Sequence, residues 1–197
     1  ELQALESIDT RYVIQASDVK YDSINKLLHL VVEQAWSSNG DLAVELFYQI
    51  TKDTMKQVLE RSASGGEEVD IAVRSQDDCN MELVVNFRSN LDKVSKNELQ
   101  FLYQYELLLY SSCDGAIEHK DTILQQTDKI SYLYHAKKEL YTPNWKSLKE
   151  LNQDQFEAMT NWGDLNPFAF EIKNYCQKIE NTMPKSSEIL RAAVTEN

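Results

Sequence analysis

The stretch Ser95-Lys-Asn-Glu-Leu-Gln-Phe-Leu-Tyr-Gln-Tyr-Glu-Leu-Leu-Leu-Tyr-Ser-Ser-Cys113 decides the fold predicted for this chain. Placed on a helix at about 100° per residue, leucine, phenylalanine and tyrosine cover nearly all of its surface, and one narrow polar strip holds Asn97, Gln100, Gln104 and Ser111. Ser95 and Glu98 have the spacing of a capping box, in which each side chain satisfies a backbone N–H of the other residue. Because a helix that is apolar nearly all round is buried, the sequence predicts a buried central helix over 95–112.

The segment before this stretch is predicted to hold a helical hairpin and then a β-hairpin. Apolar residues at helical spacing between about 22 and 61 are interrupted by the turn signal Ser37-Ser-Asn-Gly40. A turn this short predicts two antiparallel helices. After residue 66 the apolar side chains alternate instead, so 69–87 is predicted to be a β-hairpin whose apolar face is covered by the central helix.

The segment after the central helix is predicted to be helical as well. An amphipathic pattern indicates a long helix over about 116–140, which ends before Pro143 because proline cannot continue a helix. Shorter C-terminal helices are expected within 144–183, followed by a tail over 184–197. Taken together, the patterns predict a single α+β domain over 1–197 that is mainly helical.

The composition restricts the kinds of partner. The chain has 197 residues, of which 42% are hydrophobic and 26% charged, as in ordinary globular proteins. Its apolar runs are far shorter than the roughly 18 residues that span a bilayer, so no membrane span is expected. The net charge is −12, and the basic residues are scattered, with Lys137 and Lys138 as the only adjacent pair. Nucleic acid and anionic membrane surfaces are therefore disfavoured as partners, and the charge suggests a basic protein partner.

The three cysteines suggest a disulfide. A strand over 81–87 advances about 23 Å and a helix over 95–112 returns about 27 Å, which would place Cys113 close to Cys79. We expect these two cysteines to form a disulfide and Cys176 to be a buried thiol. A disulfide would indicate a periplasmic or secreted protein, whereas three reduced thiols would suit the cytoplasm.

Acidic side chains recur at four-three spacing along the predicted helix 116–140. Such a stripe is a candidate surface for a basic protein partner, and its alternative is a plain solvated face opposite the apolar arc. The candidate partner-binding residues are Asp114, Glu118, Asp121, Asp128 and Glu139.

Glu106 falls in the apolar sector of the predicted central helix, next to Tyr110. An ionised carboxylate there is costly unless it is paired, so one interpretation is a pocket in which Glu106 has a raised pKa and anchors a ligand. The alternative is a structural pair with a basic residue or a tyrosine, or a gap that lets the carboxylate reach water. The sequence contains no recognisable nucleophile motif, metal-ligand spacing or glycine-rich phosphate loop, so no catalytic residue, metal or cofactor is predicted.

These observations lead to two functional hypotheses. The first is a non-enzymatic acidic protein that binds a protein partner, in the manner of an inhibitor or an immunity protein. The alternative is a small-molecule-binding or sensory domain with a pocket at Glu106 and Tyr110, beside the central helix. An enzyme that uses Glu106 comes third.

Overall fold

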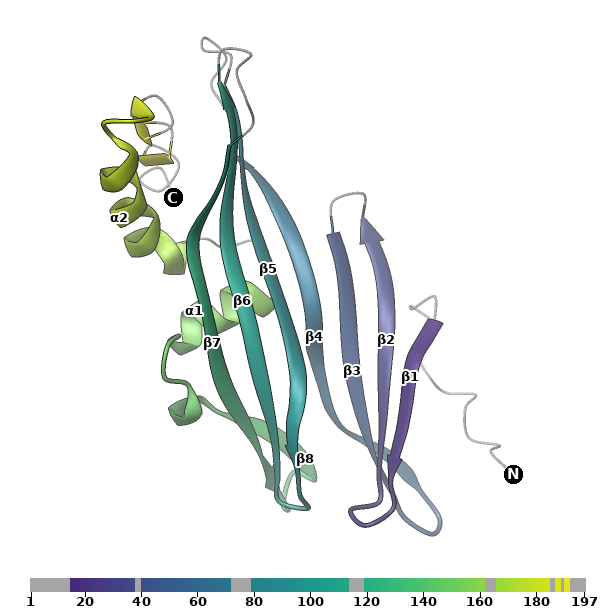
Figure 1. Cartoon of the computed structure of the whole chain (residues 1–197). Helices are drawn as coiled ribbons and strands as arrows, with labels where there is room; N and C mark the ends of the chain where they lie inside the picture. Colours follow the sequence, from purple (N-terminus) through teal and green to yellow (C-terminus); the bar gives the residue numbers. More distant parts are fainter. Residues whose placement is uncertain are drawn as a thin grey trace. The chain divides into compact units, whose positions relative to one another are not determined.

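The computed structural model describes residues 15–37, 40–71, 79–113, 119–161, 166–184, 187–188 and 190–191. Its main element is an eight-stranded sheet in which the strands follow one another in chain order, β1 to β8 (Figure 1). The strands are β1 Gln15–Asp22, β2 Leu27–Ser37, β3 Gly40–Ile50, β4 Met55–Ile71, β5 Cys79–Val94, β6 Glu98–Cys113, β7 His119–His135 and β8 Leu140–Asn144. Two α-helices, α1 Gln153–Asn161 and α2 Ala169–Ile179, and two short 3-10 helices, η2 Trp145–Ser147 and η3 Asn166–Phe168, follow the sheet.

The sheet is held in register by antiparallel pairs. Between β2 and β3, for example, Leu30 faces Leu46 and Val32 faces Val44, and these four side chains form one apolar cluster with Tyr48. On the other face of the same strands, His29 is paired with Phe47. Because successive side chains of a strand point to opposite faces, each of these strands contributes to two different environments.

The chain divides into two compact units, which we describe separately. Unit 1 consists of residues 1–65, 88–103 and 128–149, and unit 2 of residues 66–87, 104–127 and 150–197. Strands β4, β5, β6 and β7 contribute residues to both units.

Strand β6 occupies the place of the predicted central helix, and the mainly helical prediction is therefore wrong. Its odd-numbered residues from Leu99 to Leu109 are all buried, whereas Gln100, Gln104 and Glu106 on the other face are exposed or half-buried. This is the period of two that marks a strand. Phenylalanine and tyrosine, which favour strands, supply half of the buried face.

In the described residues, strands and the turns between them replace the predicted helical hairpin and the predicted long helix 116–140. Residues 22–61 contribute to β1, β2, β3 and β4, and residues 119–135 form β7. The turn signal at 37–40 does join two antiparallel elements, since Ser37 pairs with Gly40 in the β2–β3 register. The predicted β-hairpin over 69–87 overlaps the end of β4, which runs from Met55 to Ile71, and the start of β5, which runs from Cys79 to Val94; residues 72–78 lie outside the described part.

The core of unit 1 is aromatic. The rings of Phe47 on β3 and Phe101 on β6 meet edge to face with centroids 5.8 Å apart, and the Phe101 ring meets that of Tyr132 on β7 at 5.5 Å. Strands β3 and β6 are separated by two others, so a flat sheet would hold them about 14 Å apart. We infer that the sheet of unit 1 curves around this core, with Phe47, Phe101 and Tyr132 on its inner face.

In unit 2 the helices pack on the sheet. The Tyr175 hydroxyl on α2 donates a hydrogen bond of 2.6 Å to the Asp121 carboxylate on β7. Gln155 on α1 donates to the Pro167 carbonyl and to Glu171, which ties α1 to η3 and α2. Helices were predicted in this part of the sequence, and the observed ones begin at Gln153 and Ala169.

Candidate functional site

Four turns of the sheet lie together at one end of unit 1. In an antiparallel sheet whose strands follow chain order, every second turn returns to the same end. The turns in question are residues 23–26 between β1 and β2, 51–54 between β3 and β4, 95–97 between β5 and β6, and 136–139 between β7 and β8. We call this set the turn end, which is the lower end in Figure 1.

Contacts connect the turns to neighbouring strands. The Ile50 N–H donates to the Lys26 carbonyl at 2.9 Å, and the Tyr134 N–H donates to the Asn97 carbonyl at 2.9 Å. The Lys56 ammonium at the start of β4 forms an ion pair with Glu139 in the last turn. Hydrogen bonds and an ion pair with strand residues therefore hold these turns in place.

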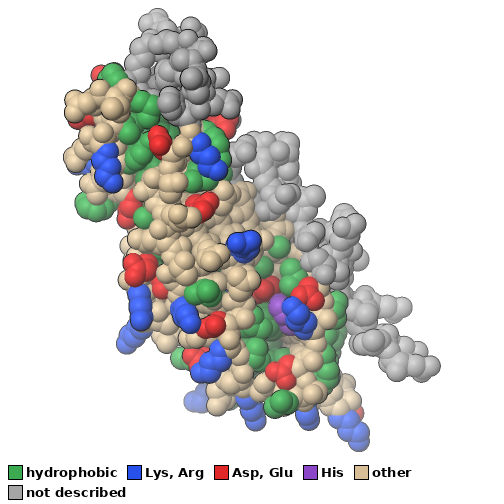
Figure 2. Space-filling model, viewed as in Figure 1, with side chains coloured by type: hydrophobic (Ala, Val, Ile, Leu, Met, Phe, Trp, Pro, Cys, Tyr) green, Lys and Arg blue, Asp and Glu red, His purple; other side chains and the backbone are tan. Residues whose placement is uncertain are grey.

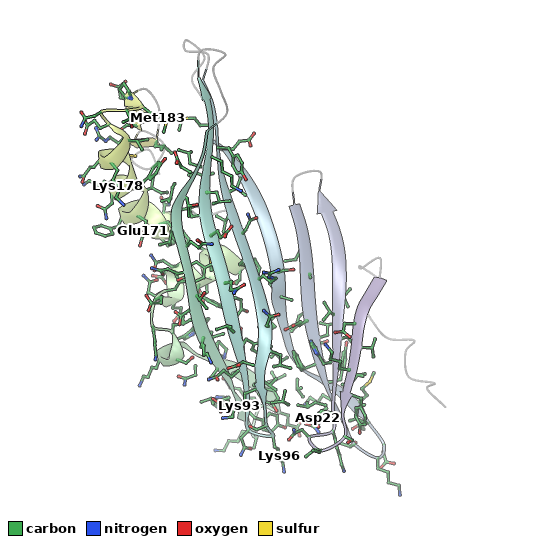
Figure 3. The ribbon with its side chains drawn as sticks, in the orientation of Figure 1. Asp22, Lys93, Lys96, Glu171, Lys178 and Met183 are labelled. Carbon is green, nitrogen blue, oxygen red and sulfur yellow. The ribbon has the colours of Figure 1, made fainter. Side chains whose placement is uncertain are left out.

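The turn end is basic, although the chain is acidic. Its four turns contain five lysines and two carboxylates, Asp53 and Glu139, and Glu139 is already paired with Lys56. All five lysines are exposed, and none forms an ion pair with another residue that the structure describes. Figure 2 shows basic side chains along the lower margin of the viewed face, and Figure 3 shows Lys93 and Lys96 at the same end as Asp22. The five turn-end lysines are Lys26, Lys52, Lys96, Lys137 and Lys138.

The first turn presents an apolar side chain among these lysines. Ile24 is 90% exposed. The Asp22 carboxylate fixes the turn by accepting hydrogen bonds from the Ile24 N–H at 2.9 Å and from the Asn25 N–H at 3.1 Å. Hydrogen bonds from Asn25, through its side chain first and then its backbone, lower the pKa of Asp22. Lys26 then adopts a φ of 55°, in the left-handed region that non-glycine residues rarely occupy.

The turn between β5 and β6 uses the two residues of the predicted capping box in another way. The Glu98 N–H donates to the Ser95 hydroxyl at 3.0 Å, as in a helix cap, but the Ser95 N–H donates to the Glu98 carbonyl at 2.8 Å and closes a hairpin. The Glu98 carboxylate pairs with Lys93 at 2.8 Å and accepts from the Ser131 hydroxyl at 2.8 Å. These bonds, with that of Lys93 the stronger influence, lower the pKa of Glu98.

A second cluster of charged side chains lies inside unit 1. Arg61 on β4 and Glu45 on β3 are paired in the strand register, and Arg61 Nε lies 3.1 Å from Glu45 Oε2. His29 Nε2 lies 3.5 Å from Glu45 Oε1, and the Arg61 guanidinium also donates to the Ser89 hydroxyl. All four side chains are more than nine-tenths buried as residues. Although the charges are close, the Arg61 Nε and Nη1 groups have no well-aligned hydrogen-bond partner among the described residues.

Aromatic rings complete the surroundings of this cluster. The Arg61 guanidinium carbon lies 3.6 Å from the centroid of the Phe101 ring and 4.9 Å from that of Tyr103, which are cation–π distances. His29 stacks on Phe47 with centroids 4.4 Å apart. Since the positive charge is compensated within unit 1 by Glu45 and by these rings, we assign the cluster a structural role.

The three described acidic residues that were predicted to bind a partner do not lie on a helix, because Asp121 and Asp128 belong to β7 and Glu139 to the turn that follows it. Asp121 accepts from the Tyr175 hydroxyl, and Asp128 is buried and accepts from the Lys149 N–H at 3.0 Å. Glu139 pairs with Lys56. Asp114 and Glu118 lie outside the described residues. A role for these residues in partner binding stays a prediction.

The predicted pocket residues lie on β6 in unit 2. Glu106 is half-buried and accepts a hydrogen bond of 2.6 Å from the Gln125 side chain, and Tyr110 lies under the Lys120 ammonium at 5.4 Å. Glu106 belongs to the same face of β6 as Gln100 and Gln104. In the observed strand its carboxylate therefore lies on the polar face, whereas the predicted helix placed it among apolar side chains.

The predicted disulfide is not found. The structure contains no disulfide among the residues it describes, and Cys176 is a buried free thiol whose pKa burial raises. Cys79 begins β5 and Cys113 ends β6, but their side chains lie outside the described part. The length estimate behind the prediction assumed a helix over 95–112, whereas β6 is a strand of sixteen residues, as long as the neighbouring β5.

Comparisons with known proteins give no family for the chain. No protein-family model matches it, and neither a curated protein nor a solved structure does. Within the described residues, no helix is long and apolar enough to cross a membrane, and no group of three or more potential ligands is placed to hold a metal ion.

The sequence analysis missed the turn end because it looked for basic residues that are adjacent in the chain. The five turn-end lysines are far apart in sequence, and the alternation of turns brings them to one end. Once the strands are recognised, the signal is readable: each of the four turns between an odd strand and the next even strand contains a lysine.

Proposed function

We propose that this chain is a binding protein that docks on a negatively charged partner surface through the turn end. The single observation that carries the proposal is the presence, on four turns at one end of unit 1, of five exposed lysines that form no ion pair within the described part of the chain. This proposal keeps a binding role but reverses the charges expected from the sequence, which suggested an acidic surface and a basic protein partner and disfavoured anionic ones.

Electrostatics supports this choice of surface. A chain with a net charge of −12 is repelled by an anionic partner unless its charge is unevenly distributed. Lysines on exposed turns are free to approach a partner, and charges that approach an opposite surface raise the association rate and direct the orientation of docking. The expected interaction is therefore oriented and weakened by salt.

Retention on a heparin resin tests the proposal. We expect the wild-type protein to bind at low salt near neutral pH despite its net negative charge. A turn-end variant should elute at clearly lower salt; its substitutions are Lys52→Gln, Lys96→Gln, Lys137→Gln and Lys138→Gln. A control variant changes the net charge equally through four other exposed lysines, and should elute as the wild type does; its substitutions are Lys146→Gln, Lys149→Gln, Lys173→Gln and Lys178→Gln.

The comparison of the two variants separates position from net charge. Wild-type protein that passes through the resin at low salt would contradict the proposal. Equal shifts in the two variants would also contradict it, because retention would then depend on overall charge. Circular dichroism of each variant confirms that the sheet is intact.

A further inference from the structure

We infer that the negatively charged surface is a layer of anionic lipid headgroups, and that Ile24 enters this layer when the turn end docks. The inference rests on the proposed function, since it names the partner of the same site. It adds an apolar contact to an electrostatic one.

The position of Ile24 is the first observation. A single exposed apolar residue is common on protein surfaces and needs no explanation. Ile24, however, is 90% exposed on a turn that Asp22 holds through two backbone hydrogen bonds, and Lys26 follows two residues later. The turn that carries Ile24 is therefore already ordered before the protein docks, so insertion of the side chain needs no further ordering of the backbone.

The backbone of the same turn is the second observation. Lys26 is held at a φ of 55°, where glycine or asparagine would be the usual residue. A lysine at this position adds a positive charge to the turn, and its backbone is strained where that of glycine would not be. Lys26 and Ile24 together give one turn the two groups that peripheral membrane contacts combine, a cation for the headgroups and an aliphatic side chain for the acyl boundary.

The residue types of the turns distinguish lipid from other polyanions. The described turn residues 23–26, 51–54, 95–97 and 136–139 contain neither arginine nor an aromatic residue. Lysine and arginine both contact nucleic-acid phosphates, but sites that also contact the bases use arginine on the base edges and aromatic rings for stacking. Lysines near a membrane surface act as point charges and need no bidentate geometry, so the composition of the turns favours headgroups.

Further apolar surface lies close to the turn end. Tyr21 precedes Asp22 and is 54% exposed, and Leu140 follows Glu139 and is 40% exposed. These residues flank the first and the last of the four turns. We expect them to add contact area once Ile24 has entered the headgroup layer.

Vesicle sedimentation is the test, with phosphatidylcholine vesicles that contain or lack phosphatidylserine. We expect the full chain to sediment only with vesicles that contain phosphatidylserine. Loss of one lysine near an anionic surface lowers the partition coefficient by about fivefold, so the turn-end variant should lose at least about a hundredfold. Ile24→Ser should lose about tenfold, and Phe170→Ser, which removes an exposed aromatic of α2, should lose nothing.

A fluorescent reporter at the tip provides an independent readout. The emission of an Ile24→Trp variant should shift to the blue when phosphatidylserine vesicles are added, beyond any change in the wild type. The inference is overturned if the protein binds heparin but not these vesicles, or if it binds them with no effect of Ile24→Ser and no shift of the new tryptophan. In those cases the proposed function still stands. Protein that binds neither heparin nor the vesicles overturns the lipid inference and the proposed function together.

Discussion

Arg61 and Glu45 form an ion pair inside unit 1, with Arg61 Nε 3.1 Å from Glu45 Oε2. The two residues face each other across β3 and β4. Since each is more than nine-tenths buried, neither charge can be left alone without a large cost in free energy.

Arg61→Met is expected to lower the free energy of unfolding by about 3–5 kcal/mol, because it leaves the Glu45 carboxylate buried without its partner. The double variant Arg61→Met with Glu45→Leu should recover most of this loss, since apolar residues of similar size often replace a buried pair at little cost. Urea unfolding of the four members of this cycle measures the coupling. Additive effects of the two substitutions would show that the pair is not coupled.

Lys26 offers a test of backbone strain. A β-branched residue is difficult to accommodate at a φ of 55°, so Lys26→Val should destabilise the protein by about 1–2 kcal/mol. Lys26→Gly should be neutral or should stabilise by up to about 1 kcal/mol, because glycine adopts this conformation without strain. Thermal unfolding compares the two variants, with Lys52→Val on another turn as the control. A result in which Lys26→Gly is the more damaging change would contradict the assigned conformation.

The lowered pKa of Glu98 predicts that the folded protein loses stability in acid. Its pKa is lowered in the folded protein by Lys93 and Ser131, from an ordinary value of 4.5. A carboxylate of this kind contributes its full stabilisation above pH 4.5, and the contribution is lost as the pH falls through the lowered pKa. Glu98→Gln should therefore be less stable than the wild type at neutral pH, and the difference should shrink below pH 4.5. A difference that does not change with pH would argue against an ionised Glu98 in the folded state.

The raised pKa of Tyr141 predicts that the folded protein loses stability in alkali. Burial raises its pKa to about 12, from an ordinary value of 10.0, and its hydroxyl donates to the Lys96 carbonyl at 3.1 Å. A group with a raised pKa contributes fully below pH 10, and its contribution is lost as the pH rises toward 12. Between these values the wild type should lose more stability than Tyr141→Phe. Absorbance titration at the tyrosinate band should also show one fewer late-ionising tyrosine in the variant.

The segment 98–113 shows where the sequence analysis failed and why. Its many leucines and tyrosines satisfy a helical period poorly and a period of two well, because every odd position from Leu99 to Leu109 is apolar. The position of Glu106 argued against the predicted helix, because a helix places its carboxylate among leucines, whereas a strand places it beside Gln100 and Gln104. Short apolar segments are ambiguous between the two structures, and the long strands of this sheet made the ambiguity larger.

Local signals were more informative than periodicity. Three features depend on residues close in sequence, and each is present in the structure: the pairing of Ser37 with Gly40, the hydrogen bond from Glu98 N–H to the Ser95 hydroxyl, and the helices α1 and α2. The buried pair of Arg61 and Glu45 and the turn end depend on strand order. No pattern within one segment reveals strand order, so both features were missed.

Lysine footprinting would test the central claim most directly. The protein is acetylated briefly with and without dextran sulfate beads, and the modified lysines are identified by mass spectrometry. Docking through the turn end predicts that Lys26, Lys52, Lys96, Lys137 and Lys138 become protected on the beads, while Lys146, Lys173 and Lys178 react as they do in solution. Protection that is equal over both sets, or confined to the second, would contradict the account.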